Sequence, residues 1–458
     1  MRDDRSGAEP GEDAMTASAA PTPRPPLGWN SFDCYGCAAT VRDLLPNLEA
    51  LAARLQPSGY EYFVVDNGWF AEYDIAPGEH YPRETHASRV HLDPYGRCLP
   101  STHSFPDGLQ PLIDRTHALG LKFGLHLMRG IPRQAVALNL PVYGIPYRAR
   151  DIADTSSVCR WCPYNYGIDM AKPGAQAFYD ALVGMLAGWG VDLIKADDIT
   201  GYPAEIGALA DAIARCGRPI VLSLSPGGDT DRRHLTAYRR ANMLRTTRDI
   251  WDNHLSLDRA FDAWRAWQDI GGDGFWPDLD MIPFGHLTRW RPRAQAPTDL
   301  GDDDSAALAG KGYERMSQLT RDQRYTFITM RALAASPLFM GGDLPTTDDF
   351  SFALLTDPAM LACNQNGVVG RLIYDAGGIE IWRAPERGAG TGGWLGIFNR
   401  APEQRTIALT GADLGLPPGC RRLHDIWRDR DLGAPTPHES LRLDIGPDGV
   451  AFCRYEAE

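Results

Sequence analysis

Two kinds of stretch alternate along most of this chain, and their alternation restricts the fold more than any other feature. Apolar, β-branched runs such as 60–67, 121–128 and 191–198 indicate strands, and stretches with apolar residues at helical spacing lie between them. About eight such strand-then-helix units follow one another over roughly 320 residues, the size of a (β/α)8 barrel with insertions. The pattern therefore predicts an α/β chain that folds as a (β/α)8 TIM barrel.

Two long stretches inside this predicted barrel carry few regular signals. We expect a long loop over 71–106 and an irregular excursion over 130–169. A long loop in a compact domain usually serves the function.

The sequence changes in character near residue 366. Several short strand candidates follow, separated by Gly, Pro and Asp turns, and helix signals are nearly absent. Residues 441–445 alternate apolar and polar side chains, as a half-buried strand does. About ninety residues suit an antiparallel β-sandwich. We therefore expect a catalytic barrel over 27–365 and a C-terminal β-sandwich over 366–458.

The first 26 residues are acidic and rich in Pro and Ala, and they lack the apolar core of a signal peptide. This composition predicts a disordered N-terminal tail over 1–26. No stretch is long and apolar enough to span a bilayer. Without an export signal, the nine cysteines are expected to be thiols, so we expect a cytoplasmic location.

The charge of the chain bears on its partners. A net charge of −13 without a Lys/Arg run argues against nucleic acid and anionic membranes. It fits a neutral or cationic small molecule or an oligosaccharide. Twelve Trp and seventeen Tyr slightly favour a sugar, because sugars stack on aromatic rings, although these residues also build cores. The sequence leaves a homo-oligomer open.

The run 191–198 begins as a buried strand and ends in Lys195, Asp197 and Asp198. Charged groups at such a strand end usually carry chemistry, because the strand ends of a barrel converge on one face. A buried Lys–Asp pair that only anchors a loop is an equal alternative from this run alone. Other polar residues at predicted strand ends are Asp33, Asp66, Asn67, His126, Ser223, Ser225, Arg245, Asp249, Asp252, Asp278 and Asp280.

This set of side chains favours one kind of chemistry. It lacks the three His ligands of a catalytic zinc site and a Gly-rich phosphate cradle, so no cofactor is expected. Paired carboxylates with aromatic residues are what the cleavage of a glycosidic bond requires. Lys195 near Asp197 would lower the pKa of Asp197 and keep it anionic. Asp249 follows a different strand and could hold the proton.

Seven motifs occur in order between residue 27 and about residue 370. They are LGWNS (27–31), GYEYFVVDNGW (59–69), GLKFG (120–124), GVDLIKAD (190–197), Arg245 with Asp249, DLDM (278–281) and SPLFMGGDL (336–344). With these motifs the chain resembles the α-galactosidase clan, glycoside hydrolase families 27 and 36, and family 27 most.

The resemblance implies a retaining exo-glycosidase that acts on terminal α-galactosides through a covalent glycosyl-enzyme. Asp197 would be the nucleophile and Asp249 the acid/base, with their carboxyl groups about 5–5.5 Å apart. The residues that it implies around the sugar are Trp29, Phe32, Asp66, Lys195, Arg245 and Asp280.

The positions that would select the sugar depart from the family pattern. Asn67 replaces the second Asp of a DD pair, His126 replaces a common Tyr, and Ile199 replaces a Cys, so that a disulfide is absent. Ser225 replaces a Glu and resembles the α-N-acetylgalactosaminidases, and Gly228 would enlarge the space at the sugar's 2-position.

We still expect Asn67, His126 and Ser225 to contact the sugar, although a structural role for His126 is a close alternative. The substrate stays open between α-galactosides, α-N-acetylgalactosaminides, β-L-arabinopyranosides and gluco-type α-glycosides. A non-catalytic carbohydrate-binding barrel is the alternative of another class, but it predicts the loss of an acid, and both Asp197 and Asp249 are present.

Two CxxC pairs occur in loops near the predicted barrel mouth. Cys34 and Cys37 form one pair, and Cys159 and Cys162 form the other. Together they would supply the four thiolate ligands of a structural zinc site, and a disulfide is a further alternative, but unpaired thiols are the first expectation.

Three charged residues beside the predicted catalytic pair are expected to have supporting roles. Arg129 would either bind the carboxylate of an acidic sugar or, as the first expectation, pair with a loop Asp. Asp198 and Asp252 would support the two acids, and Asp252 is the substitute candidate for the acid.

Overall fold

Eight parallel strands form the largest sheet of the structure, a computed structural model that describes residues 22–79, 87, 89–159, 161–291, 312–388, 391–438 and 440–457. The strand order is β12-β11-β10-β9-β5-β2-β1-β15. The two outer strands of this order meet, because Ile282, shortly after β12, pairs in parallel with Met340 of β15. The strands are β1 (Leu27–Asn30), β2 (Tyr62–Val65), β5 (Lys122–Met128), β9 (Leu193–Asp197), β10 (Val221–Leu224), β11 (Met243–Arg245), β12 (Trp276–Asp278) and β15 (Leu338–Met340).

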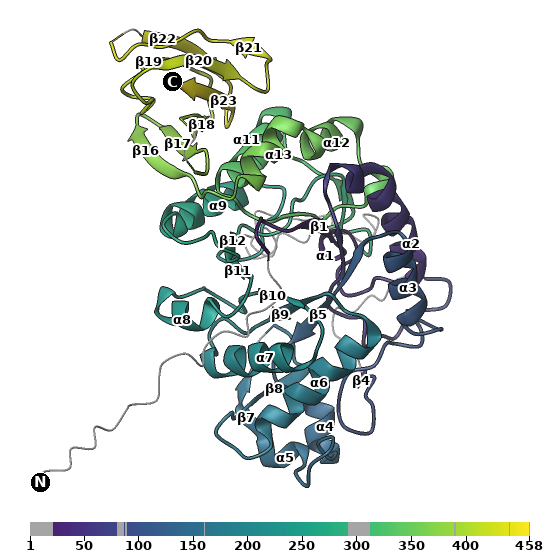
Figure 1. Ribbon diagram of the computed structural model, residues 1–458. Helices are drawn as coiled ribbons and strands as arrows, with labels where there is room; N and C mark the ends of the chain where they lie inside the picture. The colour runs from purple at the N-terminus through teal and green to yellow at the C-terminus, as the bar shows by residue number, and fades with distance from the viewer. Residues whose placement is uncertain are drawn as a thin grey trace, which may run out of the picture.

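Helices return the chain from each strand to the next and surround the ring of strands, as Figure 1 shows. This arrangement is consistent with the predicted (β/α)8 barrel. The predicted helix over 232–240 is only a 3-10 turn (Arg232–His234) followed by the short α8. The helices are α1 (Phe32–Tyr35), α2 (Val41–Ala50), α3 (Gln110–Ala118), α6 (Ala175–Trp189), α7 (Pro203–Arg215), α8 (Leu235–Tyr238), α9 (His254–Trp267), α11 (Arg321–Leu333), α12 (Asp349–Thr356) and α13 (Pro358–Gln365).

Apolar side chains fill the interior of the ring. Because side chains alternate along a strand, residues two apart point to the same face, and those facing inward meet in a layer. The layer consists of Tyr62, Val64, Leu193, Val221, Met243, Met281 and Phe339. Two residues further along β9 from Leu193, Lys195 points to the same face, and Asp197 follows it. Polar groups therefore begin where this apolar layer ends.

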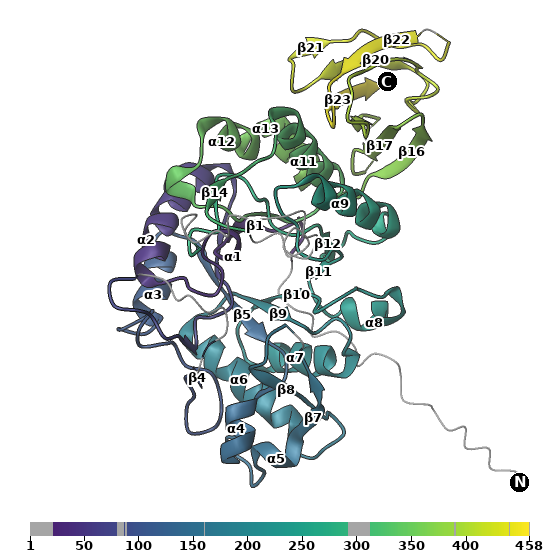
Figure 2. The same ribbon diagram turned by 180° about the vertical axis from the view of Figure 1, so that it is seen from behind.

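The excursion over 130–169 is more regular than predicted. It contains β6 (Ile131–Pro132), α4 (Arg133–Leu138), α5 (Ala149–Ile152), β7 (Ala153–Val158) and β8 (Asn165–Ile168), and β8 lies between the other two strands of a small antiparallel sheet. Figures 1 and 2 place this insertion at the end of the molecule opposite to the last strands of the chain. Two-residue strands also occur at β3 (Ala71–Glu72), β4 (Arg89–Val90), β13 (His286–Leu287) and β14 (Arg315–Met316).

The C-terminal residues form an antiparallel unit with its own apolar core. A sheet in the order β16-β17-β18-β23-β20-β21 packs against the pair β19-β22 through residues such as Ile397, Leu423 and Leu443. This arrangement fits the predicted β-sandwich. The strands are β16 (Arg371–Ala376), β17 (Ile379–Pro385), β18 (Gly393–Asn399), β19 (Arg405–Thr410), β20 (Cys420–Asp425), β21 (Arg430–Asp431), β22 (Ser440–Ile445) and β23 (Val450–Ala457), of which β20 and β21 were not predicted.

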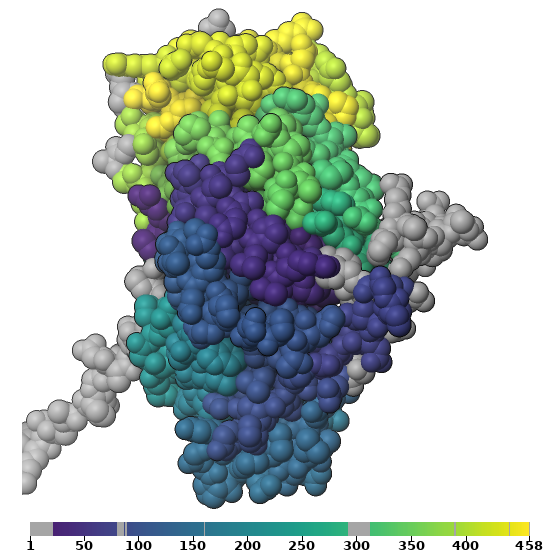
Figure 3. All heavy atoms as spheres, turned by 90° about the vertical axis from the view of Figure 1, so that its right-hand side faces the viewer, coloured from purple at the N-terminus to yellow at the C-terminus, as the bar shows by residue number. Residues whose placement is uncertain are grey.

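The unit forms one end of the molecule (Figure 3) and contacts the barrel through aromatic rings. Trp264 of α9 and Trp382 of β17 stack with their ring centroids 3.7 Å apart. Stacked, fully buried rings of this size bury a large apolar area, which holds the two parts together.

The predicted disordered tail requires a correction at its C-terminal end. Residues 1–21 lie outside the described residues, but Thr22 is buried. Its hydroxyl donates to Gly274 O at 2.9 Å, and its carbonyl accepts from Trp276 Nε1 at 2.9 Å. The chain is therefore anchored to the barrel before residue 26. Within the described ranges, no helix has the length and apolar character needed to cross a membrane.

Candidate active site

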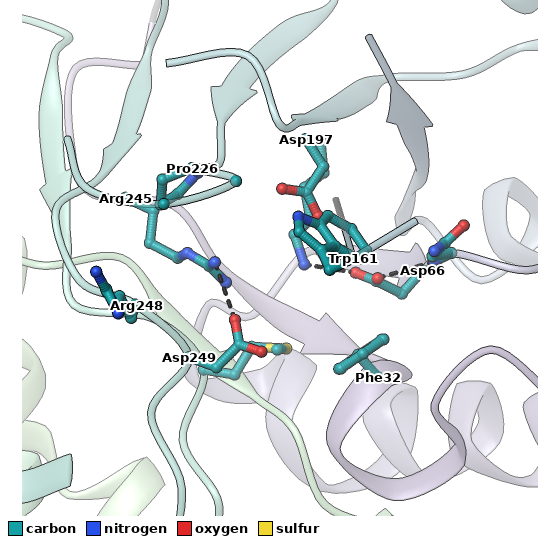
Figure 4. A pocket seen from close by; sticks show the side chains of 13 residues that line it. Phe32, Asp66, Trp161, Asp197, Pro226, Arg245, Arg248 and Asp249 are labelled. Atoms are coloured by element: carbon teal, nitrogen blue, oxygen red, sulfur yellow. Dashed lines mark hydrogen bonds and ion pairs between the residues drawn. The ribbon is translucent and has the colours of Figure 1, made fainter. Parts of the chain in front are cut away.

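A cavity of about 350 Å3 opens where the parallel strands end. Strand ends supply its charged groups, because Asp66 follows β2, Asp197 ends β9 and Arg245 ends β11. Its volume lies at the small end of the range for ligand sites. Figure 4 shows Asp197 and Asp249 on opposite sides of the open space. The lining residues are Phe32, Asp66, Asn67, Trp161, Lys195, Asp197, Pro226, Gly227, Gly228, Arg245, Arg248, Asp249 and Met281.

Both oxygens of the buried Asp197 carboxylate have partners. His126 Nε2 lies 3.1 Å from Oδ2, and the backbone N–H of Asp198 donates to Oδ1 at 2.8 Å. Burial raises the pKa of Asp197, but the His126 hydrogen bond and the positive charges of Arg245 and Lys195 outweigh it and hold the pKa well below its ordinary value. Asp197 is therefore anionic at neutral pH and oriented.

A buried ion pair closes one end of the cavity. Lys195 Nζ donates to Asp66 Oδ2 at 2.7 Å, and Asn30 Nδ2 donates to the same oxygen at 2.8 Å. Burial raises the pKa of Asp66, but the charges of Lys195 and His126 and the hydrogen bonds from Lys195 and the Asn67 backbone together outweigh burial and hold the pKa below its ordinary value. The Oδ1 atom of neighbouring Asn67 lies at the same end and is buried without a hydrogen-bond partner among the described residues. This end therefore offers a cation and acceptor oxygens to a hydroxylated ligand.

On the opposite side of the cavity, Arg245 forms ion pairs with two carboxylates. Its Nη2 lies 3.0 Å from Asp249 Oδ1, and its Nη1 lies 3.3 Å from Asp280 Oδ1. The Asp249 side chain is 42% exposed, whereas Asp280 is buried. Burial, followed by the charge of Asp280, raises the pKa of the neighbouring Asp278 to about 6. Of these carboxylates, only Asp249 both lines the cavity and reaches the solvent.

The structure brings most of the predicted site residues to this cavity, but not all of them. Trp29 is fully buried, stacks on Phe63 and donates from Nε1 to Gly342 O at 2.8 Å, so the expectation that it lines the pocket is wrong. His126 is also fully buried, contacts Asp197 and does not line the cavity. Ser225 and Asp280 line a smaller cavity of about 30 Å3, which shares Lys195 and Arg245 with the main one.

The two CxxC pairs are not assembled into a metal site. No disulfide joins the cysteines in the described part of the chain, and no cluster of three or more His, Cys, Asp or Glu side chains there could hold a metal ion. Cys34 Sγ donates to Ser31 O at 3.5 Å, whereas Cys162 Sγ lies 3.9 Å from Asn67 Nδ2. Burial, followed by the charge of Cys37, raises the pKa of Cys162, so the two pairs lie close together. Among the residues that the structure describes, their cysteines nevertheless form no group that could hold a metal ion, so the zinc alternative lacks support.

Asp252 is not placed to act as an acid. Arg315 Nε donates to its Oδ2 at 3.0 Å, and the backbone N–H of Gln318 donates to the same atom at 2.9 Å. Asp252 does not line the cavity. These hydrogen bonds hold the Asp252 carboxylate against residues 315–318.

Several lining residues were not predicted as part of the site. Trp161 projects from the insertion between β7 and β8 and is 39% exposed. Arg248 and Met281 also line the cavity. An aromatic residue between two cysteines in a mouth loop was a signal for Trp161, whereas Met281 was quoted only as the last residue of the DLDM motif and was given no role.

The chain is similar to several known glycosidases. Residues 164–366 match the family described as alpha galactosidase A. A solved family 27 β-L-arabinopyranosidase of Geobacillus stearothermophilus is 37% identical, with a TM-score of 0.83 over 95% of this chain and 96% of that one. An alpha-N-acetylgalactosaminidase of Gallus gallus is 26% identical over 93% of this chain and 92% of its own length. An alpha-galactosidase of Cyamopsis tetragonoloba is 23% identical over 92% of this chain and 84% of its own length.

Proposed function

Because the chain belongs to glycoside hydrolase family 27, we propose that it is a retaining exo-glycosidase that hydrolyses terminal α-galactosides and related pyranosides with an axial 4-hydroxyl group. The activity would reside in a catalytic barrel over 27–365, with a β-sandwich domain over 366–458. The observation that carries the proposal is that Asp197 and Asp249 line one cavity in different environments. Asp197 is buried and anionic, and Asp249 is at the open mouth.

The proposed reaction has two steps. In the first, Asp249 donates its proton to the glycosidic oxygen while Asp197 attacks the anomeric carbon, so that the aglycone leaves and a glycosyl ester forms on Asp197. In the second, Asp249 takes a proton from water, which attacks the same carbon and releases Asp197. Two inversions at one carbon retain its configuration.

The remaining charged groups would bind the sugar. Lys195 donates and Asp66 accepts hydrogen bonds, so together they suit the hydroxyl groups at the far end of a pyranose. Arg245 would leave Asp249 for a sugar hydroxyl when the substrate binds, which lets Asp249 take up from water the proton that it then donates. Phe32 would pack on an apolar sugar face. Asn67 also lies at this end, and its contact with Cys162 brings the neighbouring Trp161 there.

A second candidate is a β-L-arabinopyranosidase. The 37% identity to a family 27 β-L-arabinopyranosidase over nearly the whole chain favours it. β-L-arabinopyranose has the ring configuration of α-galactose without the hydroxymethyl group on C5. The two substrates therefore probe whether the end lined by Asn67 and Trp161 has room for that group.

A panel of nitrophenyl glycosides tests the proposal. The α-galactoside, β-L-arabinopyranoside, α-N-acetylgalactosaminide and α-glucoside would be compared by kcat/KM. We expect turnover of the α-galactoside or the β-L-arabinopyranoside and at least about 100-fold less for the α-glucoside, because buried polar groups that bind an axial hydroxyl stay unpaired with its epimer. Equal or better turnover of the α-glucoside would refute the axial specificity, and no turnover of any glycoside by folded protein would refute the activity.

A further inference from the structure

Arg129 occupies a buried position directly behind the cavity. It follows β5, and its side chain is 2% exposed. Its Nε donates to the backbone carbonyl of Asp198 at 2.8 Å and to Asp198 Oδ2 at 3.0 Å. Its Nη1 donates to Glu205 Oε1 at 3.1 Å, and its guanidinium lies 3.4 Å from the ring centre of Tyr202. Arg129 therefore holds the side chain and the backbone of Asp198 at once.

The partners of Arg129 are themselves fixed. Tyr179 OH donates to Glu205 Oε2 at 2.6 Å and accepts from the backbone N–H of Gly130 at 3.0 Å. The backbone N–H of Arg129 donates to Asp197 O at 3.1 Å. A planar guanidinium with fixed donors is well suited to such a buried network, which lysine cannot reproduce.

Asp198 needs this support because of its backbone. Its φ is +56°, in the left-handed region, which residues other than Gly adopt rarely and keep where the surroundings impose it. The backbone N–H of Asp198 donates to Asp197 Oδ1 at 2.8 Å, and Asp197 O, in the same peptide group, accepts from the backbone N–H of Arg129. The orientation of the Asp197 carboxylate therefore depends on the position of the Asp198 backbone.

The Asp198 carboxylate also contacts the loop that follows the neighbouring strand β10. A Cβ atom at Gly227 would overlap Asp198 Oδ1, so the two residues are in close contact. Gly227 lines the cavity beside Pro226 and Gly228. The position of Asp198 thus affects both Asp197 and the adjoining sugar-binding wall.

We propose that Arg129 is a positioning residue that holds Asp198 in its left-handed conformation, so that the backbone N–H of Asp198 orients the nucleophilic carboxylate of Asp197. Arg129 does not line the cavity, so it acts through Asp198 without touching substrate. The inference rests on the proposed role of Asp197 as nucleophile.

Three variants test the role of Arg129. Arg129→Lys keeps a positive charge between the two carboxylates but loses the fork of donors. Arg129→Lys/Asp198→Gly places a residue at position 198 that adopts positive φ without support. Arg400→Lys is the matched control. Arg400 also bridges two carboxylates, those of Asp258 and Glu380, and its guanidinium lies 3.7 Å from the ring centre of Phe261. It does not line the cavity.

The measurements are kcat and KM on the best nitrophenyl glycoside, the inhibition constant of the free monosaccharide, and Tm. We expect Arg129→Lys to lower kcat by about 100-fold, as a nucleophile misplaced by about 1 Å does, with KM and the inhibition constant within about threefold. The double variant should recover about tenfold of the lost kcat, because Gly adopts the left-handed conformation freely. Arg400→Lys should keep the wild-type kcat.

Other results would overturn the proposal. These are a wild-type kcat in Arg129→Lys, a loss shared equally by Arg400→Lys, or a double variant no faster than Arg129→Lys. Asp197→Ala is measured in parallel. A fully active Asp197→Ala variant would refute the proposed function itself, whereas an inactive one would leave that function standing and limit the refutation to the role of Arg129.

Discussion

His126 and Asp197 lie on neighbouring strands, and His126 Nε2 is 3.1 Å from Asp197 Oδ2. The register of β5 and β9 pairs His126 with Lys195 and Met128 with Asp197. Because side chains alternate along strands, His126 points to the barrel interior with Lys195 and Asp197. It therefore approaches the Asp197 carboxylate from within the barrel and leaves the other side of Asp197 free for the cavity.

Replacing His126 should shift the acidic limb of the pH profile. Asp197 must be ionised to attack, so kcat/KM falls as the pH falls through its pKa, which lies well below the ordinary value. His126→Phe removes a hydrogen bond to a charged group, worth about 1.5–3 kcal/mol, and should raise this pKa by about one to two units. The acidic limb of kcat/KM should move to higher pH. An unmoved limb would contradict the role of His126, and His254→Ala, at an exposed site on α9, is the control.

Lys195 and Asp66 should depend on each other for stability. Lys195→Met leaves Asp66 charged and buried without its partner, which should lower the free energy of unfolding by about 3–5 kcal/mol. Asp66→Asn in the Lys195→Met background should recover part of this loss. Urea denaturation of the two single variants and the double variant gives the coupling. If the stability losses of the two single variants add up to the loss of the double variant, Lys195 and Asp66 do not stabilise each other.

Trp29 and Phe32 should respond in opposite ways to truncation. Trp29→Ala removes a fully buried ring and should cost about 3–5 kcal/mol of stability. Phe32→Ala removes a ring that lines the cavity and should raise KM with a much smaller change in stability. Thermal unfolding and steady-state kinetics on both variants check this. A raised KM in a stable Trp29→Ala variant would reverse our assignment.

Gly227 and Gly228 form a matched pair for testing the wall of the cavity. A Cβ atom at Gly227 would collide with the Asp198 carboxylate, whereas a Cβ at Gly228 has no heavy atom within 4 Å. Gly227→Ala should therefore lower stability by about 1–3 kcal/mol through overpacking, and Gly228→Ala should change it by less than about 0.5 kcal/mol. Chemical denaturation of both variants measures the difference, and equal values would argue against the Asp198–Gly227 contact.

The sequence allowed the central barrel and most of its strand ends to be predicted. The strands are short, apolar runs that end in polar residues, and a barrel brings such ends together. Asp66, Lys195, Asp197, Arg245 and Asp249 all line the cavity for this reason. These residues are far apart in the sequence, but parallel strands bring their ends to the same face of the barrel.

The direction of individual side chains could not be predicted. Buried parallel strands are apolar on both faces, so alternation does not reveal which face points inward. Trp29 pairs in register with Phe63, and both rings pack outside the apolar layer formed by Tyr62 and Val64. The resemblance to family 27 placed Trp29 in the pocket, and an apolar strand without alternation gave no sign against it.

Short polar strands were also missed. β20 (Cys420–Asp425) has the sequence CRRLHD, and β7 (Ala153–Val158) has the sequence ADTSSV. Neither resembles an apolar strand, because most of their side chains are exposed or only partly buried. Backbone pairing with neighbours decides such strands, and that pairing depends on residues distant in sequence.

Azide rescue of two alanine variants tests the assignment of the catalytic pair most directly. Removing the nucleophile in Asp197→Ala should let azide attack the anomeric carbon once, so the glycosyl azide should have inverted configuration. Removing the acid/base in Asp249→Ala leaves the glycosyl-enzyme on Asp197, so azide should give the retained configuration, provided that the leaving group is activated. Proton NMR of the two products should show opposite anomers. The same anomer from both variants would contradict the account.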